Sequence, residues 1–158
     1  MIVKPSKFIP GQSGVIAKRP FKKGEIIFQV RGPMLTKPTQ YSFSAGLNKH
    51  IDPIKEDGTF DFGHYLNHSC DPNTFIQIID GVTPYINIVA RRNIAGGEEL
   101  AFDYASLEYE TVTKAECKCG ASNCRKLISG FKDLPEDTKV KYINEGMIHT
   151  YLLKIKRK

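Results

Sequence analysis

Four cysteines constrain this chain more than any other feature, because three of them lie close together in the sequence. Cys117, Cys119 and Cys124 form a C-x-C-x4-C pattern, and Cys70 stands alone far upstream. Thiolates at such spacing are typical ligands of structural zinc. Two disulfides in a secreted protein and free buried thiols are the alternatives. The lack of a secretory signal disfavours disulfides, and the tight spacing disfavours free thiols. The three clustered cysteines therefore favour a zinc site.

The composition is that of a soluble globular protein with one domain. Of the 158 residues, 41% are hydrophobic and 25% are charged, which is ordinary for a folded domain. The first residues contain no continuous apolar segment that would act as a secretory signal. No apolar run approaches the roughly 20 residues that span a bilayer. We therefore expect a soluble intracellular protein, cytoplasmic or nuclear, without a membrane partner.

The formal net charge is +6. Such an excess favours an anionic partner such as nucleic acid, but a merely solvated basic surface explains it equally well. Part of the excess is local and lies in the last five positions, with Lys154, Lys156, Arg157 and Lys158. Nucleic acid is therefore an open partner and not a required one. The oligomeric state does not follow from these features.

Short strands and turns dominate the first 130 residues. Three runs, 24–30, 74–79 and 85–90, are rich in β-branched and aromatic residues, and the turn-rich segment 80–84 suits a hairpin between the last two. A further short strand is expected at Leu100–Tyr104. The predicted fold class is therefore mostly β with some α.

The last third of the chain changes to a helical pattern. Pro135 is a residue type that the first turn of a helix tolerates. After it, apolar residues recur at helical spacing, at Val140, Ile143, Met147, Ile148, Tyr151, Leu152 and Ile155. Gly146 weakens the middle of this stripe and is expected to split it into two helices. We expect the stripe to pack against the β body, and a partner-binding helix is the alternative.

Three motifs follow one another along the chain. They are Asn67-His68-Ser69-Cys70-Asp71-Pro72-Asn73, Gly97-Glu98-Glu99-Leu100-Ala101-Phe102-Asp103-Tyr104, and Cys117-Lys118-Cys119-Gly120 with Cys124-Arg125. In this order and spacing they resemble the SET-domain family of protein-lysine N-methyltransferases with its post-SET zinc-binding segment. The resemblance covers about residues 10 to 130. It implies a fold of small β-sheets with a pseudoknot, in which the C-terminal segment threads under a loop. The implied parts are a SET domain at 1–112, a post-SET segment at 113–130 and a C-terminal helical extension at 131–158.

The resemblance also implies a site for S-adenosylmethionine beside a structural Zn²⁺. The cofactor-binding residues that it implies are Gln12, Ser13, Gly14, His64, Tyr65, Asn67, His68 and Tyr104. We expect His68 to form structural hydrogen bonds rather than to act as a base. Cys70 is implied as the fourth zinc ligand, together with Cys117, Cys119 and Cys124, so that the ion holds the post-SET segment against one wall of the lysine channel. The chain departs from the family pattern at two of these positions, since Gln12 replaces the first glycine of a G-x-G loop and His64 stands where arginine is frequent.

Tyr104 is the catalytic residue that the resemblance implies. A phenol can hydrogen-bond near a methyl donor without competing as a nucleophile at neutral pH, and no dedicated general base stands out. Tyr41 and Phe102 are implied as residues of the substrate channel. In relatives, phenylalanine at the position of Phe102 leaves room for a second or third methyl group.

The expected function is methyl transfer from S-adenosylmethionine to a lysine side-chain nitrogen of a protein, histone or non-histone. The alternative is a catalytically inactive SET-like module, stabilised by zinc, that binds another protein or nucleic acid. The net charge and the altered Gln12-Ser13-Gly14 loop support this alternative.

Overall fold

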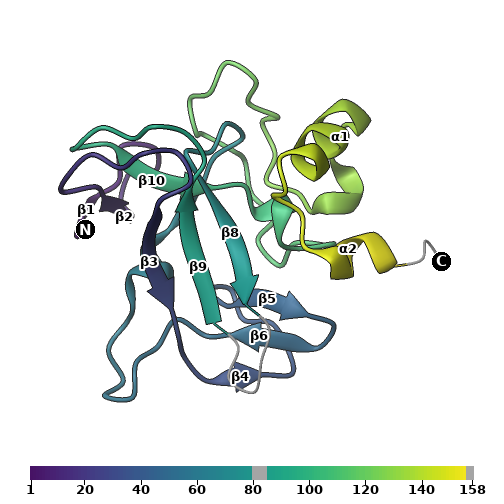
Figure 1. Ribbon diagram of the computed structural model, residues 1–158, viewed down its shortest axis with the longest axis horizontal. Helices are drawn as coiled ribbons and strands as arrows, with labels where there is room; N and C mark the ends of the chain where they lie inside the picture. Colours follow the sequence, from purple (N-terminus) through teal and green to yellow (C-terminus); the bar gives the residue numbers. More distant parts are fainter. Residues whose placement is uncertain (80–84, 156–158) are drawn as a thin grey trace.

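The computed structural model describes residues 1–79 and 85–155. These residues form ten short strands in three small sheets, brief 3₁₀ turns and two short helices (Figure 1). The sheets have the strand orders β1-β2-β10-β7, β3-β9-β8 and β4-β6-β5. The strands are β1 Ile2–Pro5, β2 Ser13–Ile16, β3 Ile26–Val30, β4 Met34–Leu35, β5 Phe43–Gly46, β6 Lys49–Ile51, β7 Asn67–His68, β8 Thr74–Ile79, β9 Tyr85–Ala90 and β10 Glu99–Phe102. The mostly β class with small sheets is confirmed.

The sheet of β3, β9 and β8 lies at the centre of the molecule (Figure 1). β8 and β9 pair antiparallel along their whole length, as predicted for the two arms of a hairpin, and the predicted turn at 80–84 lies outside the described residues. β3 begins at Ile26, two residues later than predicted, because Gly24 belongs to the preceding turn and has a φ of 83°. This left-handed conformation suits glycine.

β10 brings distant segments together. It pairs antiparallel with β2 through Leu100 and Val15, and parallel with β7 through Ala101 and Asn67. The segments 13–16, 67–68 and 99–102 therefore lie side by side, although they are far apart in the sequence. A parallel pairing requires a long connection rather than a tight turn, so local sequence patterns could not predict it.

The predicted strand at Leu100–Tyr104 is wrong at its end, since β10 stops at Phe102. The Asp103 side chain accepts a hydrogen bond from the backbone N–H of Ala105 at 3.0 Å and caps a 3₁₀ turn at Tyr104–Ser106. Acidic side chains favour this local bond at the start of a helical turn. The turn directs Tyr104 away from the strand.

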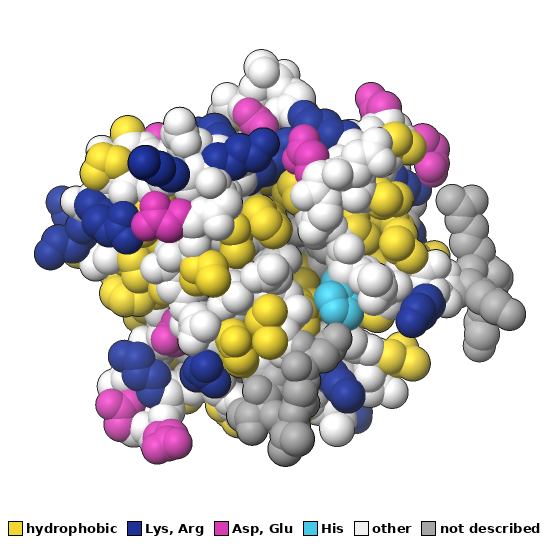
Figure 2. Space-filling view, viewed as in Figure 1, with side chains coloured by type: hydrophobic (Ala, Val, Ile, Leu, Met, Phe, Trp, Pro, Cys, Tyr) yellow, Lys and Arg dark blue, Asp and Glu magenta, His cyan; other side chains and the backbone are white. Residues whose placement is uncertain are grey.

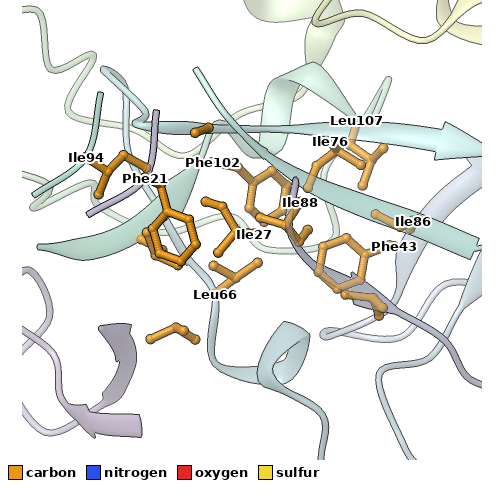
Figure 3. Close-up of a cluster of buried hydrophobic side chains, with 14 of the residues drawn as sticks. Phe21, Ile27, Phe43, Leu66, Ile76, Ile86, Ile88, Ile94, Phe102 and Leu107 are labelled. Atoms are coloured by element: carbon orange, nitrogen blue, oxygen red, sulfur yellow. The ribbon is translucent and has the colours of Figure 1, made fainter. Parts of the chain in front are cut away.

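Side chains from all three sheets share one hydrophobic core (Figure 3). Phe102 of β10 packs among Ile27, Ile88 and Phe43, and the rings of Phe43 and Phe102 stack with centroids 5.6 Å apart. Complete burial of one such side chain stabilises the fold by about 1.5–3 kcal/mol. The core therefore holds β10, and with it the segment that leads to Tyr104, firmly in place.

The C-terminal part forms two helices, α1 at Glu136–Asn144 and α2 at Thr150–Lys154, which lie beside the β body (Figure 1). Gly146 separates them with a φ of 68°, which confirms the predicted split. Met147 and Leu152 are buried in a second hydrophobic cluster, as expected for a stripe that packs against the body.

The stripe prediction is wrong for Val140 and Ile143, which are exposed. Lys139 and Tyr142 occupy the buried face of α1 instead. The predicted buried face assumed one helical periodicity on both sides of Gly146. Because α1 ends before this glycine, the residues after it do not determine which face of α1 is buried. A polar contact of Tyr142 with the body sets the buried face.

This contact is a hydrogen bond from the Tyr142 hydroxyl to Asp103 Oδ2 at 2.8 Å. The other carboxylate oxygen of Asp103 accepts from the Arg125 guanidinium at 2.8 Å. Asp103 is completely buried, and a buried carboxylate is tolerated only when it is paired and hydrogen-bonded. We call Asp103, Arg125, Tyr142 and the Ala105 N–H the Asp103 network. It joins β10, the segment 113–130 and α1.

The basic side chains are spread over the surface among acidic ones. On the face seen in Figure 2, Lys and Arg side chains gather over β1, β2 and β10, with acidic side chains between them. Arg19 pairs with Glu25 at 2.8 Å, and Arg92 pairs with Glu98 at 2.7 Å. Of the basic residues that end the chain, 156–158 lie outside the described residues. Within the described part of the chain, no helix is long and apolar enough to cross a membrane.

Tyr142→Phe should lower the free energy of unfolding by about 1.5–3 kcal/mol, because it leaves one oxygen of the buried Asp103 carboxylate without its donor. Chemical denaturation followed by circular dichroism measures this change. Tyr109→Phe is the matched control, since Tyr109 packs against the same cluster and its loss should cost about 0.5 kcal/mol or less. Equal free energies of unfolding for the two variants would contradict the proposed contribution of the Asp103 network to stability.

Candidate functional site

A cavity of about 370 Å³ collects most of the side chains that the sequence predicted for a site. Its lining includes Gln12, Ser13, Tyr41, His64, Tyr65, Asn67, His68, Phe102, Tyr104, Cys117 and Cys119. The segment 113–130 forms one wall, with Thr113, Ala115, Glu116, Lys118 and Ile128. Of the predicted cofactor-binding residues, Gly14 is not part of the lining.

Gly14 lies against the polar groups behind the cavity. A Cβ atom at this position would overlap the carboxylate of Glu99 and lie 3.2 Å from Asn67 Nδ2. Asn67 Nδ2 donates to Ser13 O at 3.0 Å and to Glu99 Oε1 at 2.9 Å. The glycine is therefore needed for the close approach of β2 to Asn67. Sequence reasoning missed Glu99, which is buried and also accepts from Ser6 Oγ at 2.8 Å.

His68 connects the cysteine cluster to Tyr104. Its Nδ1 accepts from the backbone N–H of Tyr104 at 3.3 Å, and its Nε2 lies 3.4 Å from Cys70 Sγ. Burial lowers the pKa of His68 to about 4, against the opposing effect of Asp103. The ring is therefore neutral at pH 7, with its proton on Nε2 directed to the sulfur. His68 thus makes the structural hydrogen bonds expected of it.

The Tyr104 side chain is held from several sides. Its hydroxyl donates to Leu66 O at 3.1 Å, and its ring packs against Phe102 at 4.9 Å and His68 at 5.2 Å between centroids. Burial raises the pKa of Tyr104 far above its ordinary value, and nearby Glu108 raises it further. The phenol therefore stays neutral. The hydroxyl proton is used in the bond to Leu66 O, and the side chain lines the cavity.

His64 lies in an aromatic stack at the cavity. The Phe60 ring stacks on one face with centroids 3.8 Å apart, and the Tyr41 ring lies 4.0 Å away. Phe60 and Tyr41 are about half exposed. Burial lowers the pKa of His64, so the imidazole behaves here as a flat, neutral ring. An arginine at this position would carry a charge instead.

The four cysteine sulfurs converge on one point. The Sγ atoms of Cys70, Cys117, Cys119 and Cys124 all lie within 4.8 Å of one another, and all four thiols are free. Four sulfurs at about 2.3 Å from a central Zn²⁺ would lie about 3.8 Å apart in a regular tetrahedron. Cys70 Sγ and Cys117 Sγ are 3.7 Å apart. This geometry fits a structural zinc ion and excludes disulfides, whose sulfurs lie about 2.05 Å apart.

Backbone N–H groups point at three of these sulfurs. Cys70 N donates to Cys119 Sγ, Arg125 N to Cys70 Sγ and Lys126 N to Cys124 Sγ, each at 3.4 Å. At Cys119 burial opposes ionisation, but the N–H groups of Cys70 and Ala121 outweigh it and lower the pKa to about 7. At Cys70 burial dominates and raises the pKa to about 11. Such donors orient and stabilise thiolate ligands.

Two further acidic residues of the site escaped sequence reasoning. Asp103 lies between Phe102 and Tyr104 within a recognised motif, and only its pairing with Arg125 shows its role. Glu108 lines the cavity, and burial raises the pKa of its carboxyl. A glutamate four positions after Tyr104 carries no local signal that it is buried, because acidic residues in such polar segments are usually solvated.

Comparison with known proteins gives the family. A SET domain matches residues 12–105. The chain is 30% identical over 144 residues to histone-lysine N-methyltransferase Su(var)3-9 of Drosophila pseudoobscura pseudoobscura, with 73% of this chain and 23% of the relative covered. It is 33% identical over 141 residues to histone-lysine N-methyltransferase ASHH3 of Arabidopsis thaliana, with 78% and 38% covered. The chain thus spans well under half the length of these relatives.

A solved structure of similar fold supports the same family assignment. The crystal structure of KRYPTONITE in complex with mCHH DNA, H3(1-15) peptide and SAH superposes with a TM-score of 0.62 at 26% identity. The match covers 80% of this chain and 29% of KRYPTONITE. Together with the converging cysteines and the strand arrangement, the match over residues 12–105 shows that the chain belongs to the SET-domain family.

Proposed function

We propose that this domain is a protein-lysine N-methyltransferase that uses S-adenosylmethionine. The observation that carries the proposal is the single cavity in which Tyr104 meets the loop of Asn67 and His68, with the cysteine cluster as its neighbour. KRYPTONITE, a structural relative, was crystallised with SAH, the demethylated product of this cofactor. The cofactor supplies an activated methyl group on a sulfonium.

The cofactor-binding part of the cavity is assigned to Gln12, Ser13, Gly14, Asn67 and His68, with His64 and Tyr65 beside them. Asn67 and β2 are locked to each other through Glu99, so the ligand would meet a preformed wall. Preorganised groups lose little entropy when a ligand binds. The missing glycine at Gln12 leaves this wall intact, because the close approach occurs at Gly14.

The lysine channel is assigned to Tyr41, Phe102 and Tyr104. A lysine reacts as a neutral amine, and deprotonating its side chain at pH 7 costs roughly 4.6 kcal/mol in water. Apolar and aromatic walls disfavour the ammonium by desolvation and therefore supply part of this energy. Phe102 has no hydroxyl to hold a water molecule in the channel. We therefore propose that di- and trimethylation are sterically allowed.

Tyr104 is proposed as the catalytic residue, because its side chain lines the cavity and its ring is fixed by Phe102 and His68. Its role would be to orient the amine and to interact with charge that changes during transfer. The raised pKa keeps the phenol neutral. It does not compete with lysine as a nucleophile.

The segment 113–130 is proposed as a post-SET segment that zinc holds against the cavity. The residues up to 112 would form the SET domain, and 131–158 a helical extension. The zinc would act structurally, since four thiolates leave no open position for a substrate. The histone-lysine methyltransferase relatives make a histone tail a natural first substrate, and a non-histone protein is the other proposed class.

Tyr104→Phe should lower kcat by about 10²–10³-fold, because removal of one preorganised polar group at the reacting atoms costs this much. Affinity for S-adenosylmethionine should change little. The assay follows transfer of labelled methyl groups to H3(1-15) peptide and to lysine-rich proteins, and calorimetry gives the cofactor affinity. Tyr109→Phe is the matched control. Equal label in Tyr104→Phe and wild type would contradict the role of Tyr104.

The same experiment tests the alternative, a catalytically inactive module. It would show neither methyl transfer nor affinity for the cofactor, and instead salt-sensitive binding of DNA or RNA. KRYPTONITE was crystallised with DNA as well as with peptide, so nucleic acid belongs in the test.

Elemental analysis should find one zinc per chain, and chelation should abolish cofactor binding before it unfolds the β body. The sulfur cluster packs separately from the main hydrophobic core, so loss of the ion should loosen the segment 113–130 first. Calorimetry with S-adenosylmethionine and far-UV circular dichroism follow the two events. Added zinc should restore binding. Unchanged cofactor affinity after complete zinc removal would rule out this role.

A further inference from the structure

Glu108 carries a carboxylate that the chain itself leaves partly unsatisfied. Its Oε2 atom is buried and has no hydrogen-bond partner among the described residues. The side chain lines the same cavity as Tyr104. An unpaired carboxylate in such a position costs several kcal/mol, so a sequence retains it only at the expense of stability. Such sites are candidates for a functional role.

The backbone around Glu108 is fixed on both sides. Glu108 N donates to Tyr104 O at 3.1 Å, and Phe131 N donates to Glu108 O at 2.7 Å. Gly130 permits this second contact, since a Cβ there would overlap Tyr109 O and lie 2.8 Å from Glu110 Cα. These contacts fix the backbone of Glu108, and with it the point from which the side chain reaches the cavity.

The surroundings of the carboxylate contain donors but no paired cation. Burial raises the pKa of Glu108, while the Thr111 hydroxyl and the Val112 N–H lower it less strongly. Within the described residues, no lysine or arginine forms an ion pair with it. Lys118, which also lines the cavity, pairs with Glu116 at 3.4 Å on the surface.

Glu108 and Tyr104 line the same cavity, so a group bound there would meet both side chains. The Glu108 carboxyl contributes to the raised pKa of Tyr104 and to that of Tyr151 in α2. The other titratable groups that line the cavity are Tyr41, His64, Tyr65, His68, Glu116, Cys117, Lys118 and Cys119, of which the two cysteines belong to the sulfur cluster. The two histidines have lowered pKa values and are neutral at pH 7. An ammonium that enters beside Tyr104 would meet the Glu108 carboxyl and favour its ionised form, because a nearby opposite charge lowers the pKa of a carboxyl.

We infer that Glu108 is a substrate-binding residue whose carboxylate binds the ε-ammonium group of the incoming lysine, before the lysine gives up its proton between the aromatic walls of the channel. The inference rests on the proposed function and names the group that selects its substrate. An ammonium offers three N–H donors and a full charge, which match the free Oε2. Each added methyl group removes one N–H, so Glu108 favours unmethylated lysine over its methylated forms. A neutral side chain of equal length gains nothing from it.

Glu108→Gln removes the charge and keeps the shape, so it tests this role directly. The KM for the H3(1-15) peptide should rise by about tenfold or more, as expected when one partner of a buried charge pair is lost. Affinity for S-adenosylmethionine should stay within about twofold of wild type. Glu108→Asp retains the charge and should recover part of the loss. Glu110→Gln is the matched control, because Glu110 is exposed and pairs with Lys132 at 2.6 Å.

A binding experiment separates this inference from turnover. Calorimetry with SAH present compares the H3(1-15) peptide with a version in which norleucine replaces every lysine. Wild-type protein should prefer the lysine peptide, and Glu108→Gln should lose that preference. Equal binding of both peptides by wild type, or an unchanged preference in Glu108→Gln, overturns the inference. Absence of methyl transfer by wild type would contradict the proposed function alone, because this binding comparison decides the role of Glu108 independently.

Discussion

The structure depends on the convergence of four sulfurs from two distant segments. Cys70 lies two residues after the end of β7, whereas the other three cysteines lie in a segment with little regular structure of its own. In the described residues, Glu116 and Leu127 form a single bridge within that segment. A tetrathiolate ion therefore supplies the constraint that short strands cannot. Without this constraint, the wall of the cavity that this segment forms would be held mainly by the pairing of Arg125 with Asp103 and by the bond from Asn123 to Cys70 O.

Arg125 extends this constraint into the rest of the molecule. Its backbone N–H points at Cys70 Sγ and its guanidinium pairs with Asp103, which also accepts from Tyr142 of α1. On the other side of the cluster, His68 connects Cys70 to the backbone of Tyr104. The sulfur cluster, the helical extension and the tyrosine thus share one set of buried polar contacts. Arg125 Nε is buried without a hydrogen-bond partner among the described residues, but the other polar atoms of this set are paired, and paired buried networks are rigid. The proposed alignment of a methyl donor and an amine requires such rigidity.

Local sequence patterns predicted the central strands, the split of the C-terminal helices at Gly146 and a zinc site at the three clustered cysteines, because each depends on residues near one another in the chain. Cys70 was assigned to this site by the family resemblance alone. They failed where tertiary contacts decide. The end of β10 depends on the cap by Asp103, and the exposure of Val140 follows from the contact of Tyr142. The parallel pairing of β10 with β7 is equally non-local.

The candidate site shows the same division. Family motifs pointed to the residues that line the cavity, although their roles stay proposals. The buried Glu99 and Asp103 and the partly buried Glu108 were missed, because the sequence alone does not show whether a carboxylate is solvated or enclosed. Only the fold shows that Glu99 holds β2 to Asn67 and that Glu108 faces the cavity. Burial of charge is a property of the assembled chain, so composition and periodicity do not reveal it.

X-ray absorption spectroscopy at the zinc edge tests the central claim most directly, because it counts the ligands of the ion in solution. We expect four sulfur ligands at about 2.3 Å and no nitrogen or oxygen ligand. The Cys70→Ser variant should lose one of the four. A wild-type spectrum with three sulfur ligands or fewer would show that Cys70 does not bind the ion. The proposed link between the loop of Asn67 and His68 and the segment 113–130 would then be wrong.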